Sequence, residues 1–396
     1  MSKTVKRDRP PHMLSRCRAH RHLPDINPQK TVAVAMSGGV DSSVAAALLK
    51  KRFDVVGITM KIWNCALDGT PANKRACCSV RDLEDAKKVA RTLSIPHYVL
   101  DLHNDFERDV ITPFYNGYLN GLTPNPCITC NRKIKFGLLL DKVGSMGIDY
   151  LATGHYAKII KTGSGFLLKK GVDENEQSYW LYNLTQRQMK KIVFPLGDMT
   201  KDKVRTMARR LELPVSEKPK SREICFIPQN DYRAFFINRA AGATGSSGKN
   251  FSGFIYNRND EIIGRHNGIF NFTVGQREGL GISTGRKMFV TDIIQEKKKV
   301  VVGEKRDLFR DECIAGEVNW NAGRRNIKFP LRVKARIRYK HEETGVMVFP
   351  FRKNFYKILF DKPQPAITPG QSIVFYGRDT VLGGGIIQRH GVINKE

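Results

Sequence analysis

The stretch TVAVAMSGGVDSSVAAALL, Thr31 to Leu49, joins two apolar runs through a pair of glycines. Its first part, Thr31 to Met36, is continuous and rich in β-branched residues, which is typical of a buried strand. Its last part is rich in Ala and Leu, which favours a helix. Because Gly38 and Gly39 permit a sharp turn and a close approach of the backbone, we predict a strand, a turn and a helix whose first amides bind an anion.

The polar residues of this turn indicate that the anion is a nucleotide phosphate accompanied by a divalent cation. The loop serines add hydroxyl donors, whereas Asp41 would repel a phosphate unless a cation lay between them. The loop has no lysine, so the pattern G-x-x-x-x-G-K-S/T of common NTPases is absent. SGGVDSS instead resembles the signature of the PP-loop ATP pyrophosphatases, which implies ATP and Mg²⁺ as cofactors. The expected nucleotide contacts are Ala35, Met36, Ser37, Gly38, Gly39, Val40, Asp41 and Ser42.

Length and charge favour a multidomain protein with a polyanionic partner. The 396 residues can form two or three cores, and 67 Lys and Arg against 38 Asp and Glu give a net charge of +29. Nucleic acid is the first candidate for such a basic chain. A membrane partner is set aside, because no apolar stretch approaches the roughly 18 residues of a transmembrane helix. We expect a monomer.

Cysteine usage and the N-terminal composition bear on the compartment. The chain has eight cysteines and no secretory apolar region, which indicates a reducing environment such as the cytoplasm. Residues 1–30 are basic and rich in proline, so we predict a disordered leader. The alternative is a mitochondrial presequence, because this segment is poor in acidic residues.

Alternating apolar strands and helices predict a doubly wound parallel sheet after the loop. Ligands of such sheets bind at the carboxyl ends of the strands, so Met60 and Gly154 are expected near the nucleotide. The predicted strands are Phe53 to Met60, His97 to Leu102 and Asp149 to Thr153, and the predicted helices begin near Ser79 and span Asn131 to Met146.

Two cysteine segments suggest thiol chemistry. Cys127 and Cys130 stand in TPNPCITCN, at an expected helix start beside Arg132, Lys133 and Lys135, where the helix dipole and the cations would lower a thiol pKa. A lone C-x-x-C is also compatible with a redox pair or with half of a zinc site completed by Cys77 and Cys78. Cys225, in SREICFI, alone would be a small buried hydrophobe.

Together, these motifs resemble the tRNA-uridine 2-sulfurtransferases, or tRNA 2-thiouridylases. The matching segments are collinear from about residue 31 to 388, and they include SGGVDSS, TPNPCITCN, ATGHYA (152–157), DENEQSYWLY (173–182), SREICFI, FTVGQREGLGI (272–282), ITPGQSIVFY (367–376) and LGGGII. The resemblance implies adenylation of O2 of the wobble uridine, followed by displacement of AMP by sulfur from a cysteine persulfide.

The resemblance also assigns the thiols. Cys130 matches the nucleophile of the family and Cys225 its persulfide cysteine, whereas Cys127 stands where the family often has Asp. Cys127, Cys130 and Cys225 could therefore hold a 4Fe-4S cluster with one iron open for sulfide, which is the alternative to the persulfide.

Further residues match family positions that contact tRNA. They are Asn125, Pro126, Cys127, His155, Glu176, Gln177, Ser178, Arg338, Tyr339 and Gln371. The implied partners are a tRNA with a wobble uridine and an upstream sulfur-relay protein or cysteine desulfurase.

Two β-rich modules are expected after residue 230. Gly242 to Gly248 predicts a flexible connection, and short strands with Gly/Asn turns then predict a small β domain. In LRVKARIRYK, 331–340, strict alternation places five cations on one strand face for a phosphate backbone. Repeated short strands favour a closed C-terminal barrel.

The predicted architecture is therefore an α/β protein: a basic leader (1–30), a Rossmann-like PP-loop domain (31–230), a central β-rich domain (231–305) and a C-terminal β-barrel that binds tRNA (306–396). Two rival functions remain open at this point. One is another PP-loop tRNA-adenylating thiolase, and the other is a non-catalytic, zinc-containing RNA-binding protein.

Overall fold

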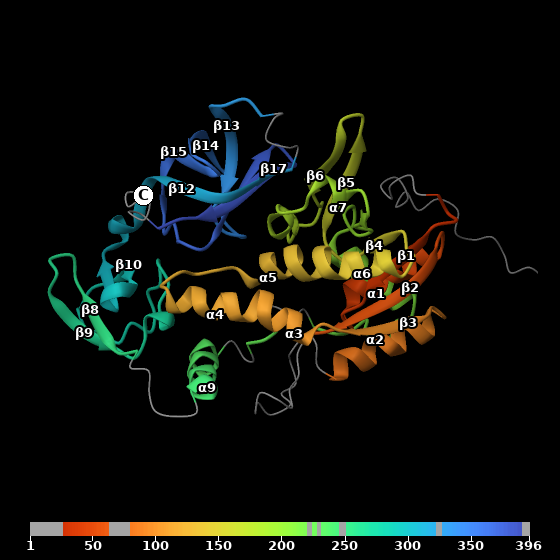
Figure 1. The fold of residues 1–396 in the computed structure, drawn as a ribbon, viewed down its shortest axis with the longest axis horizontal. Helices are drawn as coiled ribbons and strands as arrows, with labels where there is room; N and C mark the ends of the chain where they lie inside the picture. Colours follow the sequence, from red (N-terminus) through yellow and green to blue (C-terminus); the bar gives the residue numbers. More distant parts are fainter. Residues whose placement is uncertain are drawn as a thin grey trace, which may run out of the picture.

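A computed structural model of the chain describes residues 27–62, 80–219, 224–227, 231–244, 251–321 and 327–389. A parallel sheet with helices on both faces lies at one end of the molecule, a small mixed sheet lies at the other, and a β-barrel covers one side between them (Figure 1). The predicted fold class is confirmed. The basic leader falls largely on residues 1–26, which lie outside the described residues.

The parallel sheet has the strand order β3-β2-β1-β4-β7, and all of its pairings are parallel. Strand β1 alternates between two cores: Val32 and Val34 face one apolar cluster and Ala33 faces the other. Both faces are thus covered, which explains why β1 is a continuous apolar run. The strands are β1 (Thr31–Ala35), β2 (Asp54–Lys61), β3 (His97–Asp101), β4 (Tyr150–Ala152) and β7 (Ile192–Val193).

The helices around this sheet differ from the prediction at one place. The expected helix Asn131 to Met146 begins earlier, at Pro126, and its middle part, Cys130–Leu139, is π-helical. The helices are α1 (Val40–Lys50), α2 (Val80–Thr92), α3 (His103–Phe106), α4 (Thr112–Leu119), α5 (Pro126–Thr129), α6 (Leu140–Ser145), α7 (Gln186–Met189), α8 (Lys201–Arg210) and α9 (Tyr232–Thr244), with a second π-helical segment at Glu107–Ile111. Within the described residues, none is long and apolar enough to cross a membrane.

The central sheet has the order β10-β11-β8-β9 and its own apolar core. The predicted flexible connection before it is wrong in its first part, because α9 continues to Thr244. The rest of that connection, 245–248, lies outside the described residues. The strands are β8 (Gly253–Tyr256), β9 (Ile262–His266), β10 (Phe289–Ile294) and β11 (Lys299–Gly303).

The C-terminal strands form the predicted closed barrel, because β12 pairs with both β15 and β17. An unpredicted hairpin of β5 (Ala157–Thr162) and β6 (Gly165–Lys170) adds to β17 and joins the barrel to the parallel-sheet region. The barrel strands are β12 (Phe309–Trp320), β13 (Leu331–Arg336), β14 (Thr344–Arg352), β15 (Phe355–Pro365), β16 (Ser372–Gly377) and β17 (Thr380–Ile387).

Candidate functional site

The nucleotide loop connects β1 to α1 and is held by its own hydroxyl groups. The amide of Ser37 donates to Oγ of Ser42 at 3.2 Å, and Oγ of Ser43 donates to the carbonyl of Gly39 at 2.8 Å. Gly39 is the N-cap of α1 and offers no side chain to cap the helix. The amides of the first helical turn are therefore available to an anion.

Two glycines permit close approaches around this loop. Gly38 has φ +66°, and a Cβ there would lie 2.1 Å from the carbonyl oxygen of Asp82 on α2. A Cβ on Gly154, after β4, would lie 2.8 Å from the backbone of Asp41 and Ser42. Both positions therefore need glycine, which explains Gly38 in the loop and Gly154 in the ATGHYA segment in physical terms.

The two methionines predicted near the nucleotide differ in exposure. Met36 is almost fully buried, and its carbonyl accepts a hydrogen bond from Oγ1 of Thr59 at 2.8 Å. Met60 is half-buried at the carboxyl end of β2 and packs against two apolar clusters, one of which contains the candidate thiols. Met60 thus lies between the nucleotide edge of the sheet and the cysteines.

Sequence reasoning missed two lysines that complete the loop from distant segments. Lys201, the first residue of α8, donates to both carboxylate oxygens of Asp41 at 2.5 Å, and the hydroxyl of Tyr156 donates to Oδ1 of Asp41 at 2.7 Å. Burial, and then the neighbouring Asp41, raise the pKa of Tyr156. Asp41 was expected to face a cation, and a protein ammonium occupies that role.

Lys218 makes the second long-range contact. Its ammonium donates to the carbonyl of Gly38 at 2.9 Å, to Asp82 at 2.5 Å and to Asp85 at 2.7 Å. Burial alone would lower the pKa of Lys218, but the two carboxylates outweigh it and the pKa is raised. This lysine fixes the start of α2 against the nucleotide loop.

The residues present fit ATP with Mg²⁺. The loop offers helix amides and serine hydroxyls for phosphates, and Asp41 is a carboxylate on the same turn. Mg²⁺ commonly takes one or two protein carboxylates and completes its shell with waters and substrate phosphates. Asp41 would hold the ion and the loop amides would hold the phosphates.

The cysteine loop, TPNPCITCN (123–131), contains a helix start as expected, because α5 begins at Pro126. Oδ1 of Asn125 accepts the amides of Cys127 at 3.1 Å and Ile128 at 3.3 Å, so Asn125 is the N-cap of α5. Pro126 is buried, whereas Cys127 is exposed. Of these residues, Cys127 therefore presents its side chain to an incoming ligand.

Cys130 and Cys225 pack in one apolar cluster, although they come from distant segments. Cys130 is buried, and Cys225 and its neighbour Ile224 pack against the same cluster as Phe226. Burial raises the pKa of Cys130, and Lys135 only partly opposes this effect. The expectation of a lowered thiol pKa is wrong for Cys130 in this conformation, because desolvation of the thiolate exceeds the influence of nearby cations.

The three cysteines do not form a metal site in this conformation. Among the described residues, which include Cys127, Cys130 and Cys225, no three His, Cys, Asp or Glu side chains group together to hold a metal ion. Cys127 instead lies near Tyr232 of α9, whose pKa is raised by burial and then by that thiol. The 4Fe-4S alternative thus does not fit the arrangement observed. Cys77 and Cys78, invoked for a zinc site, lie outside the described residues.

Most of the residues that match tRNA-contact positions near the sheet are buried. His155 packs against the rings of Phe136 and Phe194, with Nδ1 2.6 Å from Oγ1 of Thr153. Burial lowers its pKa well below the ordinary value. Gln177 accepts the amide of Tyr156 at 3.0 Å. His155 and Gln177 therefore use their side chains for contacts within the protein.

Glu176 belongs to a buried charge network between the hairpin region and the barrel. Its carboxylate accepts the amide of Ser178 at 2.8 Å and pairs with Arg336 of β13 at 2.6 Å. Arg336 also pairs with Glu343 at 2.8 Å, and Glu343 in turn pairs with Lys170 of β6. The network joins the two regions through charges that are mostly hidden from water.

This network corrects the predicted basic strand. β13 ends at Arg336, so the alternation does not continue to residue 340. Arg336 faces the network, whereas Arg332, Lys334, Arg338 and Lys340 are exposed. The face therefore offers fewer free cations than the pattern suggested.

Tyr339 and Gln371 contact neighbouring segments. Tyr339 stacks on Trp180 with ring centroids 4.0 Å apart, and burial raises its pKa to about 12. Gln371 donates to the carbonyl of Thr123 at 2.7 Å, which ties the barrel to the cysteine loop. Arg338 remains exposed beside Tyr339.

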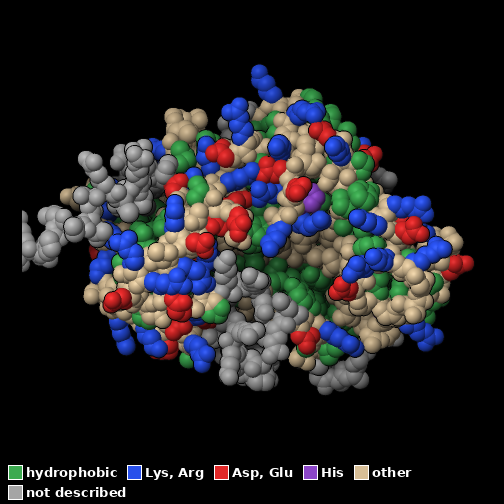
Figure 2. All heavy atoms as spheres, turned by 180° about the vertical axis from the view of Figure 1, so that it is seen from behind, with side chains coloured by type: hydrophobic (Ala, Val, Ile, Leu, Met, Phe, Trp, Pro, Cys, Tyr) green, Lys and Arg blue, Asp and Glu red, His purple; other side chains and the backbone are tan. Residues whose placement is uncertain are grey.

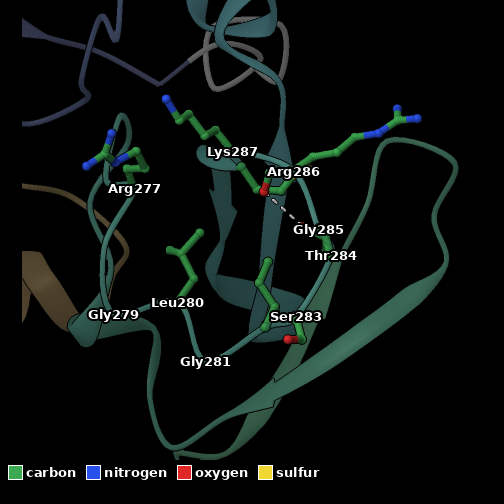
Figure 3. A pocket seen from close by; sticks show the side chains of 11 residues that line it. Arg277, Gly279, Leu280, Gly281, Ser283, Thr284, Gly285, Arg286 and Lys287 are labelled. Atoms are coloured by element: carbon green, nitrogen blue, oxygen red, sulfur yellow. Dashed lines mark hydrogen bonds between the residues drawn. The ribbon is translucent and has the colours of Figure 1, made fainter.

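A basic hollow lies on the central β domain. It encloses about 540 Å³ and is formed by a loop in which Gly279, Gly281 and Gly285 adopt positive φ. Arg277 and Lys287 stand on one side of it and Arg286 extends away (Figure 3). The face opposite to Figure 1 is also hollowed near its middle, with hydrophobic side chains inside and both basic and acidic side chains around the rim (Figure 2).

Both family models and curated relatives match this chain over most of its length. Family models match residues 30–229 (tRNA methyl transferase HUP domain), 246–304 (tRNA methyl transferase PRC-barrel domain) and 310–387 (Aminomethyltransferase beta-barrel domain). The chain is 45% identical to the tRNA-specific 2-thiouridylase MnmA of Acetivibrio thermocellus, over 91% of this chain and 99% of that protein. The same identity and coverage hold for the MnmA of Caldicellulosiruptor saccharolyticus.

A solved structure, described as a predicted tRNA methyltransferase subunit of Methanocaldococcus jannaschii, is 19% identical over 46% of this chain and 74% of that chain, with a TM-score of 0.30.

Proposed function

The chain belongs to the tRNA-specific 2-thiouridylase family, and from that membership we propose that it uses ATP to replace O2 of the wobble uridine of a tRNA by sulfur. Two of the matching family models carry methyl transferase in their descriptions, whereas the curated relatives are named thiouridylases. The paired thiols of this chain favour sulfur transfer.

One observation carries the proposal. Cys130 and Cys225 pack in a single apolar cluster, and Met60 at the carboxyl end of β2 packs against the same cluster. Two thiols that share a cluster beside the nucleotide edge of a parallel sheet are arranged for a reaction that couples ATP to sulfur.

The first step prepares a leaving group. O2 of the uridine attacks the α-phosphorus of ATP, the bond to pyrophosphate breaks, and the N3 proton of the uridine passes to solvent. The loop amides and the serine hydroxyls hold the phosphates during this step. Mg²⁺, held at Asp41, would neutralise the charge that develops on pyrophosphate.

The second step transfers sulfur. The terminal sulfur of a persulfide on Cys225 attacks C2, and AMP leaves with the oxygen. Cys130, as the thiolate, then attacks Sγ of Cys225, which breaks the sulfur–sulfur bond, releases 2-thiouridine and leaves a Cys130–Cys225 disulfide. A thiol reductant must reduce this disulfide, and an upstream relay protein or cysteine desulfurase must reload the persulfide.

The tRNA would bind across the exposed cations of the barrel and the basic loop of the central domain. Arg338 and Lys340 on the barrel and Arg277 and Lys287 on the loop are suited to phosphates. The target base would leave the anticodon stack to reach the thiols.

Nucleoside analysis tests the proposal. The purified protein is incubated with an unmodified tRNA transcript, Mg²⁺–ATP and a persulfide donor, and the digested tRNA is analysed by mass spectrometry. We expect 2-thiouridine with stoichiometric AMP and pyrophosphate. A different thiolated nucleoside would favour a PP-loop thiolase of another base, and stoichiometric zinc without AMP would favour the RNA-binding alternative.

A further inference from the structure

Lys201 reaches the nucleotide loop from a rigidly held backbone. Thr200 caps α8, and the amide of Lys201 donates to Oδ2 of Asp173 at 2.6 Å. The side chain of Lys201 is 13% exposed, and in the described part of the chain its ammonium donates to Asp41 alone. A fixed backbone with a flexible four-carbon stem leaves the ammonium free to move while its origin stays in place.

Asp41 accepts three hydrogen bonds from the protein and is still partly exposed to solvent. Lys201 donates to both of its oxygens and Tyr156 donates to Oδ1, yet the Asp41 side chain is 32% exposed. An ammonium 2.5 Å from both oxygens of Asp41 lies where a cation bound by both oxygens would lie, and two cations there would repel each other. Metal binding at Asp41 therefore requires that Lys201 move.

Lys218 provides the contrast. Its ammonium is shared by two carboxylates and a loop carbonyl, so moving it would break three hydrogen bonds at once. Among the residues that the structure describes, Lys201 has one carboxylate partner, which a divalent cation would take over. The displaced ammonium would then be a free cation beside the loop amides, where this loop has no lysine of its own.

We propose that Lys201 is an exchangeable counter-ion of the nucleotide loop: it neutralises Asp41 when the site lacks ligand, and it transfers to a phosphate of the nucleotide when the divalent cation binds Asp41. The inference deepens the proposed use of ATP. It predicts that metal and polyphosphate bind cooperatively because each completes the exchange that the other begins.

Calorimetry with Mn²⁺ and pyrophosphate tests the exchange without tRNA or sulfur. In Lys201→Met, Mn²⁺ alone should bind about tenfold more tightly, because its competitor is gone, while pyrophosphate in the presence of Mn²⁺ should bind about tenfold more weakly. Lys203→Met, on the exposed side of the same helix, should change neither affinity. A purely structural ion pair would weaken both affinities together, and that result would overturn the inference.

A second pair of variants covers the case in which Lys201→Met does not fold. Asp41→Asn releases Lys201 from its acid, so metal-free pyrophosphate should bind more tightly than to the wild type. Part of this gain comes from removing a negative charge. The gain should therefore shrink about tenfold in the double variant with Lys201→Gln, and an equal gain in both would overturn the exchange.

Failure of the exchange and failure of the proposed function are distinguishable. If the wild type forms 2-thiouridine but the variants show no opposite shifts, only the role of Lys201 falls. If the wild type binds neither Mn²⁺ nor pyrophosphate, the proposed ATP chemistry falls, and the inference falls with it.

Discussion

The nucleotide loop and the thiol cluster are built in opposite ways. The loop is polar and already formed, with Ser42, Ser43 and two lysines holding its shape. The thiol cluster, which is the apolar cluster of Cys130 with Cys225 packed against it, is closed around Cys130, which is buried among aromatic and aliphatic side chains. One end of the candidate site is ready for its ligand, and the other end must open before sulfur can reach a base.

The difference between a preformed polar loop and an apolar thiol cluster has a physical reason at each place. A preformed loop loses little conformational entropy when it binds phosphates. A thiol exposed to solvent is open to oxidation and to attack by other thiols, and burial protects Cys130 from both, whereas Cys225 is only partly buried. The loop would therefore serve nucleotide binding and the thiol cluster sulfur transfer, and substitutions at one should leave the function of the other largely intact.

The largest effect is expected at the thiols. Cys130→Ser and Cys225→Ser should each lower 2-thiouridine formation about a thousandfold or more, because a hydroxyl neither carries nor releases sulfur. ATP–pyrophosphate exchange with tRNA should stay within about threefold, since the loop is formed independently. Nucleoside mass spectrometry measures 2-thiouridine formation, and radiolabelled pyrophosphate measures the exchange.

Cys127→Ser is the matched control for this experiment. Cys127 is exposed on α5, three residues before Cys130. It matches a tRNA-contact position, but the persulfide route does not use its thiol, and serine keeps a side chain of similar size and polarity there. Its activity should remain near that of the wild type. Loss of thiolation in all three cysteine variants would instead support a cluster with three thiolate ligands.

The next largest effect is expected at Gly38. Gly38→Ala forces a side chain into a left-handed conformation and against the carbonyl of Asp82, and should destabilise the protein by about 3 kcal/mol while abolishing pyrophosphate binding. Gly147→Ala has a similar φ of +76° but open space, and should cost only about 1 kcal/mol. Urea unfolding and calorimetry measure both, and equal losses would show that the contact with α2 is unimportant.

The loop was predictable because its information is local. The residues from Ser37 to Ser43 specify the turn, the helix start and the hydroxyl donors within two helical turns. The parallel sheet follows from apolar runs that are equally local. The barrel was predictable from repeated short strands, but the addition of β5 and β6 to it was not, because strand pairing across distant segments leaves no periodic signal.

The partners of the loop could not be predicted for the same reason. Lys201 and Lys218 reach the loop from α8 and from the segment after it, and no spacing connects them to Asp41 or Gly38. On β13, basic and apolar residues alternate as predicted up to Arg336, where the strand ends. The sequence could not reveal that Glu176 and Glu343 would draw that side chain inside.

A smaller effect concerns access to the closed end. Since burial raises the pKa of Cys130, its thiolate forms at higher pH than that of an ordinary thiol, and its alkylation should accelerate only above the pH range in which an ordinary thiol ionises. In the ligand-free protein at pH 8, Cys127 should react with iodoacetamide at least about tenfold faster than Cys130, as measured by peptide mass spectrometry. Addition of tRNA with Mg²⁺ and a non-hydrolysable ATP analogue should narrow this ratio if the cluster opens. Equal rates in the ligand-free protein would contradict the closed state.

The smallest effect is expected at His155, which follows Gly154 at the nucleotide edge. Burial lowers its pKa, so the folded state keeps the ring neutral while the unfolded chain binds a proton below about pH 6.5. The contribution of His155 to stability is therefore complete above that pH. It is lost as the pH falls, by at most about 1.4 kcal/mol per pH unit.

In His155→Asn, urea unfolding should show a lower stability at pH 7.5 but a shallower decline between pH 6.5 and 5. Other buried histidines lower the stability of both proteins alike, so the difference between the two slopes isolates His155. Parallel slopes would mean that the ring is protonated in the folded protein, and the nucleotide edge would then carry a positive charge that the closed packing against Phe136 and Phe194 does not accommodate.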